Sequence, residues 1–279
     1  MKSVVKIFAL FLALMPAVPA MAGIKEDVEF LSSPMLEGRG NCSRGASEAA
    51  FFIIRRMRSM GLDPSVQSFP LSGGLGRNVF AVVKGNQRSE KYILVCAKYD
   101  GLGKIGDAVY PGADANASGV AVLLHLAENL PEGGNYVFLA IDGHGDGLAG
   151  AEAALSLPYR YSMVVNLDTI GSTLAPPNKY RPDFLIALGG KIHEKKLEQA
   201  NAQTTLRLYY DYYGSKGFTD YFYNKASDHV PFMKKGTSCV MFTSGITMNT
   251  NKVSDTAETL DYEVLNRRAE LILRWLSLL

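Results

Sequence analysis

Short apolar segments typical of β-strands alternate along this sequence with amphipathic segments of helical spacing, and no other feature constrains the fold as strongly. The expected strands are residues 79–84, 92–97, 136–141, 163–167, 184–188 and 238–242. The expected helices are residues 46–60, 118–130, 149–156, 191–202 and 262–279. Segments 92–97 and 136–141 are almost continuously apolar, as in strands that are covered on both faces. The sequence therefore predicts an α/β fold, a three-layer α/β/α sandwich with a mainly parallel central sheet.

Polar side chains follow several of these strands, where an open α/β sheet binds its ligands. Those after the second, third and fourth strands are Lys98, Asp100, His144 and Asp168. Residues 249–255 follow the last strand. Residues 112–119 open a helix, and the free amides of such a first turn can bind an anion or a carboxylate. We therefore expect the functional site at the carboxyl ends of the strands.

The first 22 residues have the features of a secretory signal peptide. Lys2 and Lys6 form a basic start, residues 7–18 are an apolar run, and Ala20-Met21-Ala22 provides a cleavage pattern. We predict cleavage after Ala22 and a secreted or periplasmic product in which residues 23–279 form a single domain. An uncleaved anchor at the membrane interface is the alternative. No later apolar segment approaches the roughly 18–20 residues of a membrane span.

Charge and cysteine content exclude some function classes. The chain has 29 Lys and Arg residues against 27 Asp and Glu residues, a balance that does not favour binding to nucleic acid. An odd number of cysteines in an exported chain leaves at least one free thiol. Of Cys42, Cys96 and Cys239, the latter two lie in expected strands and should be buried.

Nine segments, in order, resemble the M28 family of zinc aminopeptidases, to which the glutaminyl cyclases are related. The first reads Leu-Ser-Ser-Pro-Met-Leu-Glu-Gly-Arg-Gly, and another reads Pro-Gly-Ala-Asp-Ala-Asn-Ala-Ser-Gly. The segments are residues 31–40, 61–64, 77–79, 97–100, 111–119, 142–148, 166–168, 227–232 and 254–256. The resemblance covers most of the chain after the signal peptide and implies a zinc-exopeptidase-like fold.

The resemblance also implies five zinc ligands and a glutamate general base, and the sequence departs from this pattern. Only the ligand position occupied by Asp168 keeps a ligand. The other four ligand positions are occupied by Lys98, Ala115, Gly145 and Asn251. His144 occupies the position of the general base. Because Ala115 and Gly145 have no donor side chain and an ammonium group has no lone pair, a zinc site with the family geometry is not expected.

Lys98 has a specific expected role in such a site. Its ammonium group can occupy part of the space of the lost metal and pair with Asp168 or Asp114, which would otherwise repel each other and Asp100. The alternative is a lysine that points into solvent.

Three functions follow from these observations. The preferred one is a non-catalytic homologue whose cleft, bordered by Asp228 and His229 as well, binds a peptide or another small exported ligand without a cofactor. The second is a metallo-aminopeptidase or a cyclase-like enzyme with a rearranged zinc site. Its candidate donors are Asp100, Asp114, His144, Asp168 and His229. The third is a metal-free hydrolase in which His144 is the base, oriented by Asp142 or Asp146.

A tyrosine-rich segment near residues 209–223 has no assigned place in this scheme. Its aromatic rings can line a groove for a peptide or a sugar. They suit the surface of a β-hairpin or the edge of the core equally well.

Overall fold

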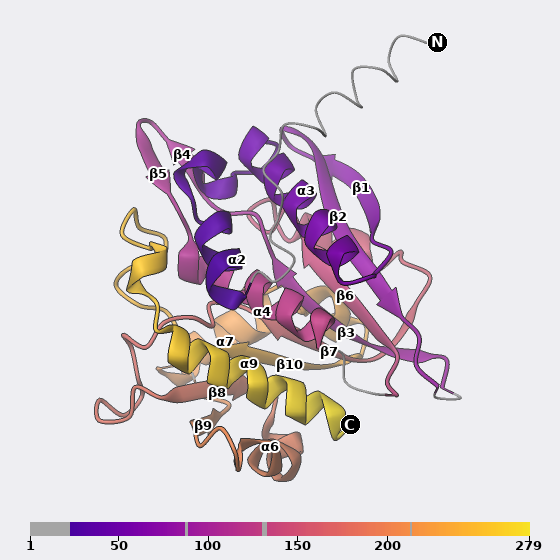
Figure 1. The fold of residues 1–279 in the computed structure, drawn as a ribbon, viewed down its shortest axis with the longest axis vertical. Helices are drawn as coiled ribbons and strands as arrows, with labels where there is room; N and C mark the ends of the chain where they lie inside the picture. The colour runs from indigo at the N-terminus through magenta and orange to yellow at the C-terminus, as the bar shows by residue number, and fades with distance from the viewer. Residues whose placement is uncertain (1–22, 87–88, 130–132, 213) are drawn as a thin grey trace.

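A mixed sheet of eight strands forms the centre of the protein in the computed structural model (Figure 1). The structure describes residues 23–86, 89–129, 133–212 and 214–279. The predicted signal peptide, residues 1–22, and Leu130 of a predicted helix lie outside the described residues. In spatial order the strands are β1 (Ser65–Leu71), β2 (Gly74–Val83), β6 (Tyr136–Ile141), β3 (Lys91–Lys98), β7 (Arg160–Leu167), β10 (Ser238–Thr243), β8 (Phe184–Leu188) and β9 (Arg207–Tyr210).

The centre of this sheet is parallel and its flanks are mixed. β6, β3, β7 and β10 run parallel to their neighbours within this group. β1, β2 and β8 each pair antiparallel with a neighbour, and β9 pairs parallel with β8. A separate hairpin consists of β4 (Gly103–Ile105) and β5 (Ala108–Tyr110). The prediction of an α/β fold with a mainly parallel sheet is therefore confirmed.

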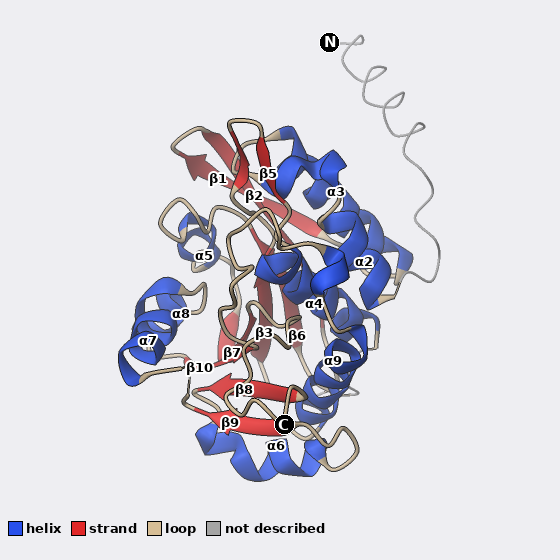
Figure 2. Cartoon of the chain, turned by 90° about the vertical axis from the view of Figure 1, so that its left-hand side faces the viewer, coloured by secondary structure: helices blue, strands red, loops and turns tan. Residues whose placement is uncertain are grey.

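Helices cover both faces of the sheet (Figure 2). One face carries α2 (Ile24–Leu31), α3 (Arg44–Ser59), α4 (Ser118–Glu128) and α9 (Tyr262–Ser277), and the other carries α5 (Ala149–Ala154), α7 (Lys216–Tyr221) and α8 (Val230–Lys234). α6 (Glu194–Asn201) packs beside α9. Short helical turns are η1 (Pro34–Arg39), η2 (Ala113–Ala117), η3 (Lys191–His193), η4 (Phe222–Ala226) and η5 (Ala257–Thr259). None of the described helices is long and apolar enough to cross a membrane.

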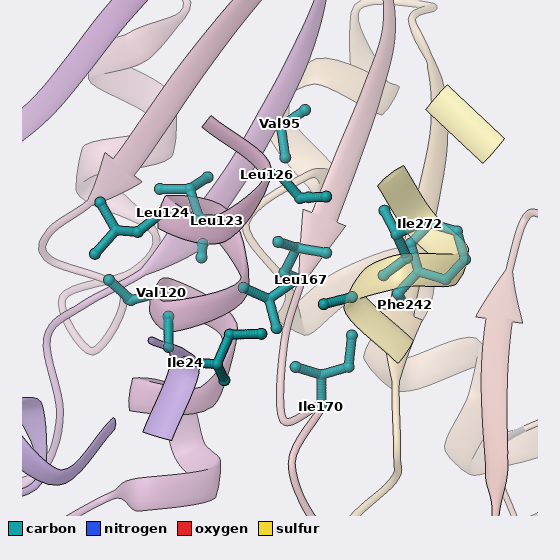
Figure 3. Packing of buried hydrophobic residues seen from close by; sticks show 14 of the residues in the cluster. Ile24, Val95, Val120, Leu123, Leu124, Leu126, Leu167, Ile170, Phe242 and Ile272 are labelled. Carbon is teal, nitrogen blue, oxygen red and sulfur yellow. The ribbon is translucent and has the colours of Figure 1, made fainter. Parts of the chain in front are cut away.

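Alternation along the strands supplies hydrophobic side chains to cores on both faces. In β3, Val95 and Ala97 belong to the core beneath α4 and α9, whereas Leu94 and Cys96 belong to the core beneath α5 and α8. Figure 3 shows the first of these cores, where α4 packs against the central strands and Phe242 lies near α9. Burial on both faces explains why the central strands are almost continuously apolar.

The elements that the sequence did not predict are short or lie at an edge. β1 is an edge strand that contains Pro70, and its polar residues are mostly exposed. Proline is tolerated there because an edge strand has one unpaired side. β9 has four residues and forms the other edge. α2 has only eight residues, too few for a clear helical period.

Candidate functional site

Asn116 ties the carboxyl ends of β3 and β7 to the segment that opens α4. Its side-chain nitrogen donates to the carbonyl of Lys98 at 3.2 Å and to that of Leu167 at 2.9 Å. Its side-chain oxygen accepts from the amide of Thr169 at 2.9 Å. β3 pairs in parallel with β6, which places Lys98 opposite Ile141. The residues that follow β3, β6 and β7 therefore lie at one edge of the sheet.

His144 and Asp228 form the principal polar pair at this edge. His144 Nδ1 lies 2.8 Å from Asp228 Oδ2, and the His144 side chain is 24% exposed whereas that of Asp228 is 1% exposed. Burial and Lys98 lower the pKa of His144, but the Asp228 carboxylate more than offsets them, so the pKa is raised. Burial alone would raise the pKa of Asp228, but His144 holds it below its ordinary value. The pair can thus hold an oriented, charged imidazole.

The side chains of the two acids expected to orient His144 form no hydrogen bond or ion pair with it. Asp142 accepts hydrogen bonds from the amides of Arg77 and Gly143, both at 2.9 Å. Asp146 accepts from the amide of Ser72 at 2.7 Å. Both carboxylates are therefore committed to the backbone, and the orienting role belongs to Asp228, which lies 84 residues further along the chain.

Asp100 lies beside His144 and is almost completely buried. Its Oδ2 accepts from the amide of Gly145 at 3.2 Å, while its Oδ1 is buried and makes no hydrogen bond within the described chain. Burial raises the pKa of Asp100 to about 6, although His144 and Lys98 act in the opposite direction. Burial outweighs the neighbouring positive charges, so this carboxylate gains a proton at a higher pH than an ordinary aspartate does.

Asp114 and Asp255 hold the turn that opens α4. Asp255 accepts from the amide of Asp114 at 2.8 Å and from that of Ala115 at 3.1 Å. Asp114 in turn accepts from the amides of Gly171 at 2.7 Å and Ser172 at 3.2 Å. Burial and the neighbouring Asp255 raise the pKa of Asp114 to about 7. The expectation that the first-turn amides bind a carboxylate is met by the protein's own Asp255.

Asp168 and His229 belong to a buried hydrogen-bond network. Asp168 Oδ2 accepts from the hydroxyl of Ser227 at 3.0 Å, and that hydroxyl accepts from Asn166 at 2.7 Å. His229 Nε2 donates to the carbonyl of Tyr223 at 2.7 Å, and its Nδ1 lies 3.4 Å from the Asn166 nitrogen. Burial lowers the pKa of His229, so its imidazole is neutral. Both of its ring nitrogens are occupied by protein groups, so His229 is a structural residue.

Lys98 ends β3 and is half-buried. In the described part of the chain its ammonium group forms no ion pair, and the expected pairing with Asp168 or Asp114 is therefore absent. Its charge nevertheless acts on its neighbours, because it lowers the pKa values of both Asp100 and His144. Lys98 thus supplies a positive charge to the site without being fixed to one carboxylate.

The remaining predicted site residues offer no side-chain donor to the centre of the site. Ala115 is buried beside Asp114. Gly145 follows His144, and a Cβ atom added there would have no neighbour closer than 3.6 Å. Asn251 lies in an exposed turn with a φ of +59° and makes no side-chain hydrogen bond to the described residues.

The donor set does not fit a zinc ion. Over residues 23–86, 89–129, 133–212 and 214–279, no three His, Cys, Asp or Glu side chains are grouped so that they could hold a metal. His144 Nδ1 is bound to Asp228, and both nitrogens of His229 are occupied. A zinc site needs three or four converging donors. The rearranged set of Asp100, Asp114, His144, Asp168 and His229 does not provide them.

Sequence reasoning missed the two buried arginines that support this edge. Arg39 donates to four backbone carbonyls and Arg268 to three, and burial lowers the pKa of each to about 10. The carbonyls bound by Arg39 belong to Leu31, Tyr99, Pro111 and Gly112, and those bound by Arg268 belong to Ile170, Ser172 and Phe184. Arg39 lies in one of the segments that resemble the M28 family, and so does Asp255, the acid described above. This resemblance was the signal in the sequence that could have identified them.

Comparisons with known proteins agree with the fold. The chain is similar to the zinc aminopeptidase BSAP from Bacillus subtilis, with a TM-score of 0.74 and 14% identity over 94% of this chain and 96% of that one. It is similar to an aminopeptidase from Aneurinibacillus sp. strain AM-1, with a TM-score of 0.71 and 17% identity over 91% and 92% of the two chains.

A glutaminyl cyclase from Porphyromonas gingivalis is also similar, with a TM-score of 0.71 and 17% identity over 91% of this chain and 96% of that one. No curated protein sequence matches the chain. The sequence profile of Peptidase family M28 matches residues 78–276, which is more than half of the chain. The protein therefore belongs to peptidase family M28.

Proposed function

We propose that this protein is an exported member of the M28 family that has lost zinc catalysis and uses its cleft to bind a peptide or another small ligand. The observation that carries this proposal is the donor set at the carboxyl edge of the sheet. Within the described residues no three side chains converge as metal ligands. The positions that the family resemblance assigns to ligands hold Lys98, Ala115, Gly145 and Asn251.

The state of the acids supports a metal-free cleft. A divalent cation stabilises several carboxylates close together, and without one they must pair, accept hydrogen bonds or protonate. Asp228 pairs with His144, whereas Asp100 and Asp114 have pKa values raised to about 6 and about 7 by burial. Asp168 accepts a hydrogen bond from Ser227. Each acid thus has a means of existing without a metal ion.

Zinc binding by the mature protein, residues 23–279, tests the proposal. After equilibrium dialysis against zinc, we expect well below one equivalent bound, with no difference between the wild type and Asp168→Ala. Asp63→Ala, a change at an exposed loop residue, is the matched control. Stoichiometric zinc bound at micromolar affinity, lost in Asp168→Ala and kept in Asp63→Ala, would refute the proposal.

The His144–Asp228 pair favours a second candidate, a hydrolase that works without metal. In the neutral form of His144, a carboxylate that accepts from Nδ1–H leaves Nε2 available to accept a proton from water. The water oxygen would then attack a carbonyl carbon, and the protonated imidazole would pass its proton to the leaving amine. Lys98 is the nearby cation that can stabilise the developing oxyanion.

Assays with aminoacyl and N-terminal glutaminyl substrates separate the two candidates. The first candidate predicts no turnover with or without a chelator. The second predicts turnover that resists the chelator, is lost in His144→Gln and falls in Asp228→Asn. Turnover abolished by the chelator would refute both, because it would require a bound metal.

A further inference from the structure

An open cavity of about 510 Å³ lies between the end of β8, Asp211 and Tyr212 after β9, and the α7–η4 segment, and its lining includes neither His144 nor Asp228. Leu188 borders it at the end of β8, and because β8 runs antiparallel to β10, this end is directed away from the carboxyl end of β10. α7 lies on the sheet face opposite α9 (Figure 2). The volume is within the roughly 300–1,000 Å³ of small-molecule sites.

Backbone contacts fix two walls of this cavity. The hydroxyl of Tyr223 donates to the carbonyl of Cys239 at 2.7 Å. This contact requires Gly189, whose φ is +71°, because a Cβ atom there would lie 2.0 Å from the Tyr223 oxygen. The amide of Gly189 donates to Asp211 Oδ1 at 2.9 Å. The Tyr223 ring and the Asp211 carboxylate therefore have defined positions before any ligand binds.

The cavity lining combines aromatic rings with polar side chains that include both hydrogen-bond donors and hydrogen-bond acceptors. Tyr212 and Tyr223 contribute rings. The side chains of Lys216, Asp220 and Asn224 line the cavity and make no hydrogen bond or ion pair with the part of the chain that the structure describes. The lining thus offers acceptors from carboxylates, donors from an ammonium group, and an amide that does both.

The charges of the lining limit the class of ligand. An anion would meet the carboxylates of Asp211 and Asp220, and a cation would meet Lys216. A neutral molecule with adjacent hydroxyl groups satisfies donors and acceptors together, and an apolar ring face can stack on tyrosine. A pyranose sugar has both features.

We propose that this cavity binds a neutral pyranose sugar, with Tyr212 and Tyr223 as stacking surfaces and Asp220 and Asn224 as partners for its hydroxyl groups. Neither His144 nor Asp228 lines the cavity, although Tyr223 also contacts His229. The proposed sugar contacts therefore do not use the two residues of the His144–Asp228 pair.

Saturation-transfer NMR with maltose, cellobiose and diacetylchitobiose tests this proposal, and isothermal titration gives the affinity. We expect at least one sugar to bind, and Tyr212→Ala to weaken it by about tenfold or more, as for a truncated aromatic contact. Tyr212 is 40% exposed, so this variant should fold. Asp220→Asn, which keeps the shape of the side chain, should weaken binding as well.

Tyr221→Ala is the matched control, because Tyr221 is 56% exposed on α7, the helix that carries Lys216 and Asp220, but does not line the cavity. It should leave the affinity unchanged. The proposal is overturned if none of the sugars binds at tens of millimolar, or if Tyr221→Ala weakens binding as much as Tyr212→Ala. It is also overturned if an uncharged blocked tripeptide binds here and the sugars do not compete with it.

Discussion

Replacement of Asp228 by asparagine would measure how strongly the protein holds His144 in its charged form. Asparagine keeps the shape of the side chain but removes the charge that lies 2.8 Å from His144 Nδ1. A hydrogen bond to a charged group contributes about 1.5–3 kcal/mol. Because His144 is partly exposed and can lose its proton, the variant leaves no trapped charge, so we expect a loss in this range rather than the larger cost of an unpaired buried ion.

The loss should depend on pH in a defined direction. The pKa of His144 is raised from 6.5, so its contribution to stability is fully present below pH 6.5 and disappears as the pH rises through the folded-state pKa. The pKa of Asp228 is lowered from 3.8, so its contribution is present above pH 3.8 and disappears as the pH falls through its folded-state value. The difference between wild type and variant should therefore be largest from about pH 5 to 6.5 and should shrink above this range.

Urea unfolding at a series of pH values gives the free energies, and NMR titration of the imidazole gives the pKa of His144. In Asp228→Asn the pKa of His144 should fall, because burial and Lys98 still lower it while the carboxylate is gone. Asp146→Asn is the control, since Asp146 is near in sequence but bonded to Ser72. Equal effects of the two variants, or a loss of stability that does not change with pH, would refute the assignment.

Three further predictions concern charge, metal and thiols. Lys98→Met should change stability by less than about 1 kcal/mol, because no described carboxylate pairs with Lys98, while NMR titration should find the pKa of His144 raised further. Equilibrium dialysis against zinc should detect binding only in a variant that carries five substitutions together, each of which introduces the residue that the family resemblance implies. The five variants with one substitution each should not bind zinc, because several donors must converge on the ion. The five changes are Lys98→His, Ala115→Asp, His144→Glu, Gly145→Glu and Asn251→His. A thiol reagent should label exposed Cys42 in the folded protein but Cys96 and Cys239 only after unfolding, as mass spectrometry would show, since burial raises the pKa of both buried thiols.

The sequence predicted the central strands and the major helices because their hydrophobic periods are strong. The strand at residues 136–141 has the same bounds in the structure, and the helix predicted at 262–279 is α9 (Tyr262–Ser277). The burial of Cys96 and Cys239 was also predicted correctly from their apolar surroundings. Edge strands such as β1 carry polar residues and proline, so their pattern contains no comparable signal.

The sequence predicted which residues lie at the site better than it predicted the hydrogen-bond partners of their side chains. The positions of His144 and Asp100 follow from the strand ends, but the partner of His144 is Asp228, which tertiary packing brings from the loop before α8. Asp142 and Asp146 are nearer in sequence, yet backbone amides bind both of them. The sequence likewise could not show that the Lys98 side chain stays unpaired among the described residues, because that depends on side-chain direction.

The acids at this edge accept hydrogen bonds from the protein, whereas four positions that the family resemblance assigns to ligands make no side-chain hydrogen bond to the residues that the structure describes. Asp255 and Asp114 accept hydrogen bonds from backbone amides, and Asp168 accepts one from Ser227. Within the described chain, no side-chain hydrogen bond is made at the other four ligand positions, which are Lys98, Ala115, Gly145 and Asn251. Loss of an acid that receives backbone amides would leave buried donors unsatisfied, at a cost of about 1–3 kcal/mol each. A residue whose only role is to bind metal has no such constraint. The fold can therefore require Asp114 and Asp255 whether or not a metal ion binds nearby, because both acids accept hydrogen bonds from backbone amides.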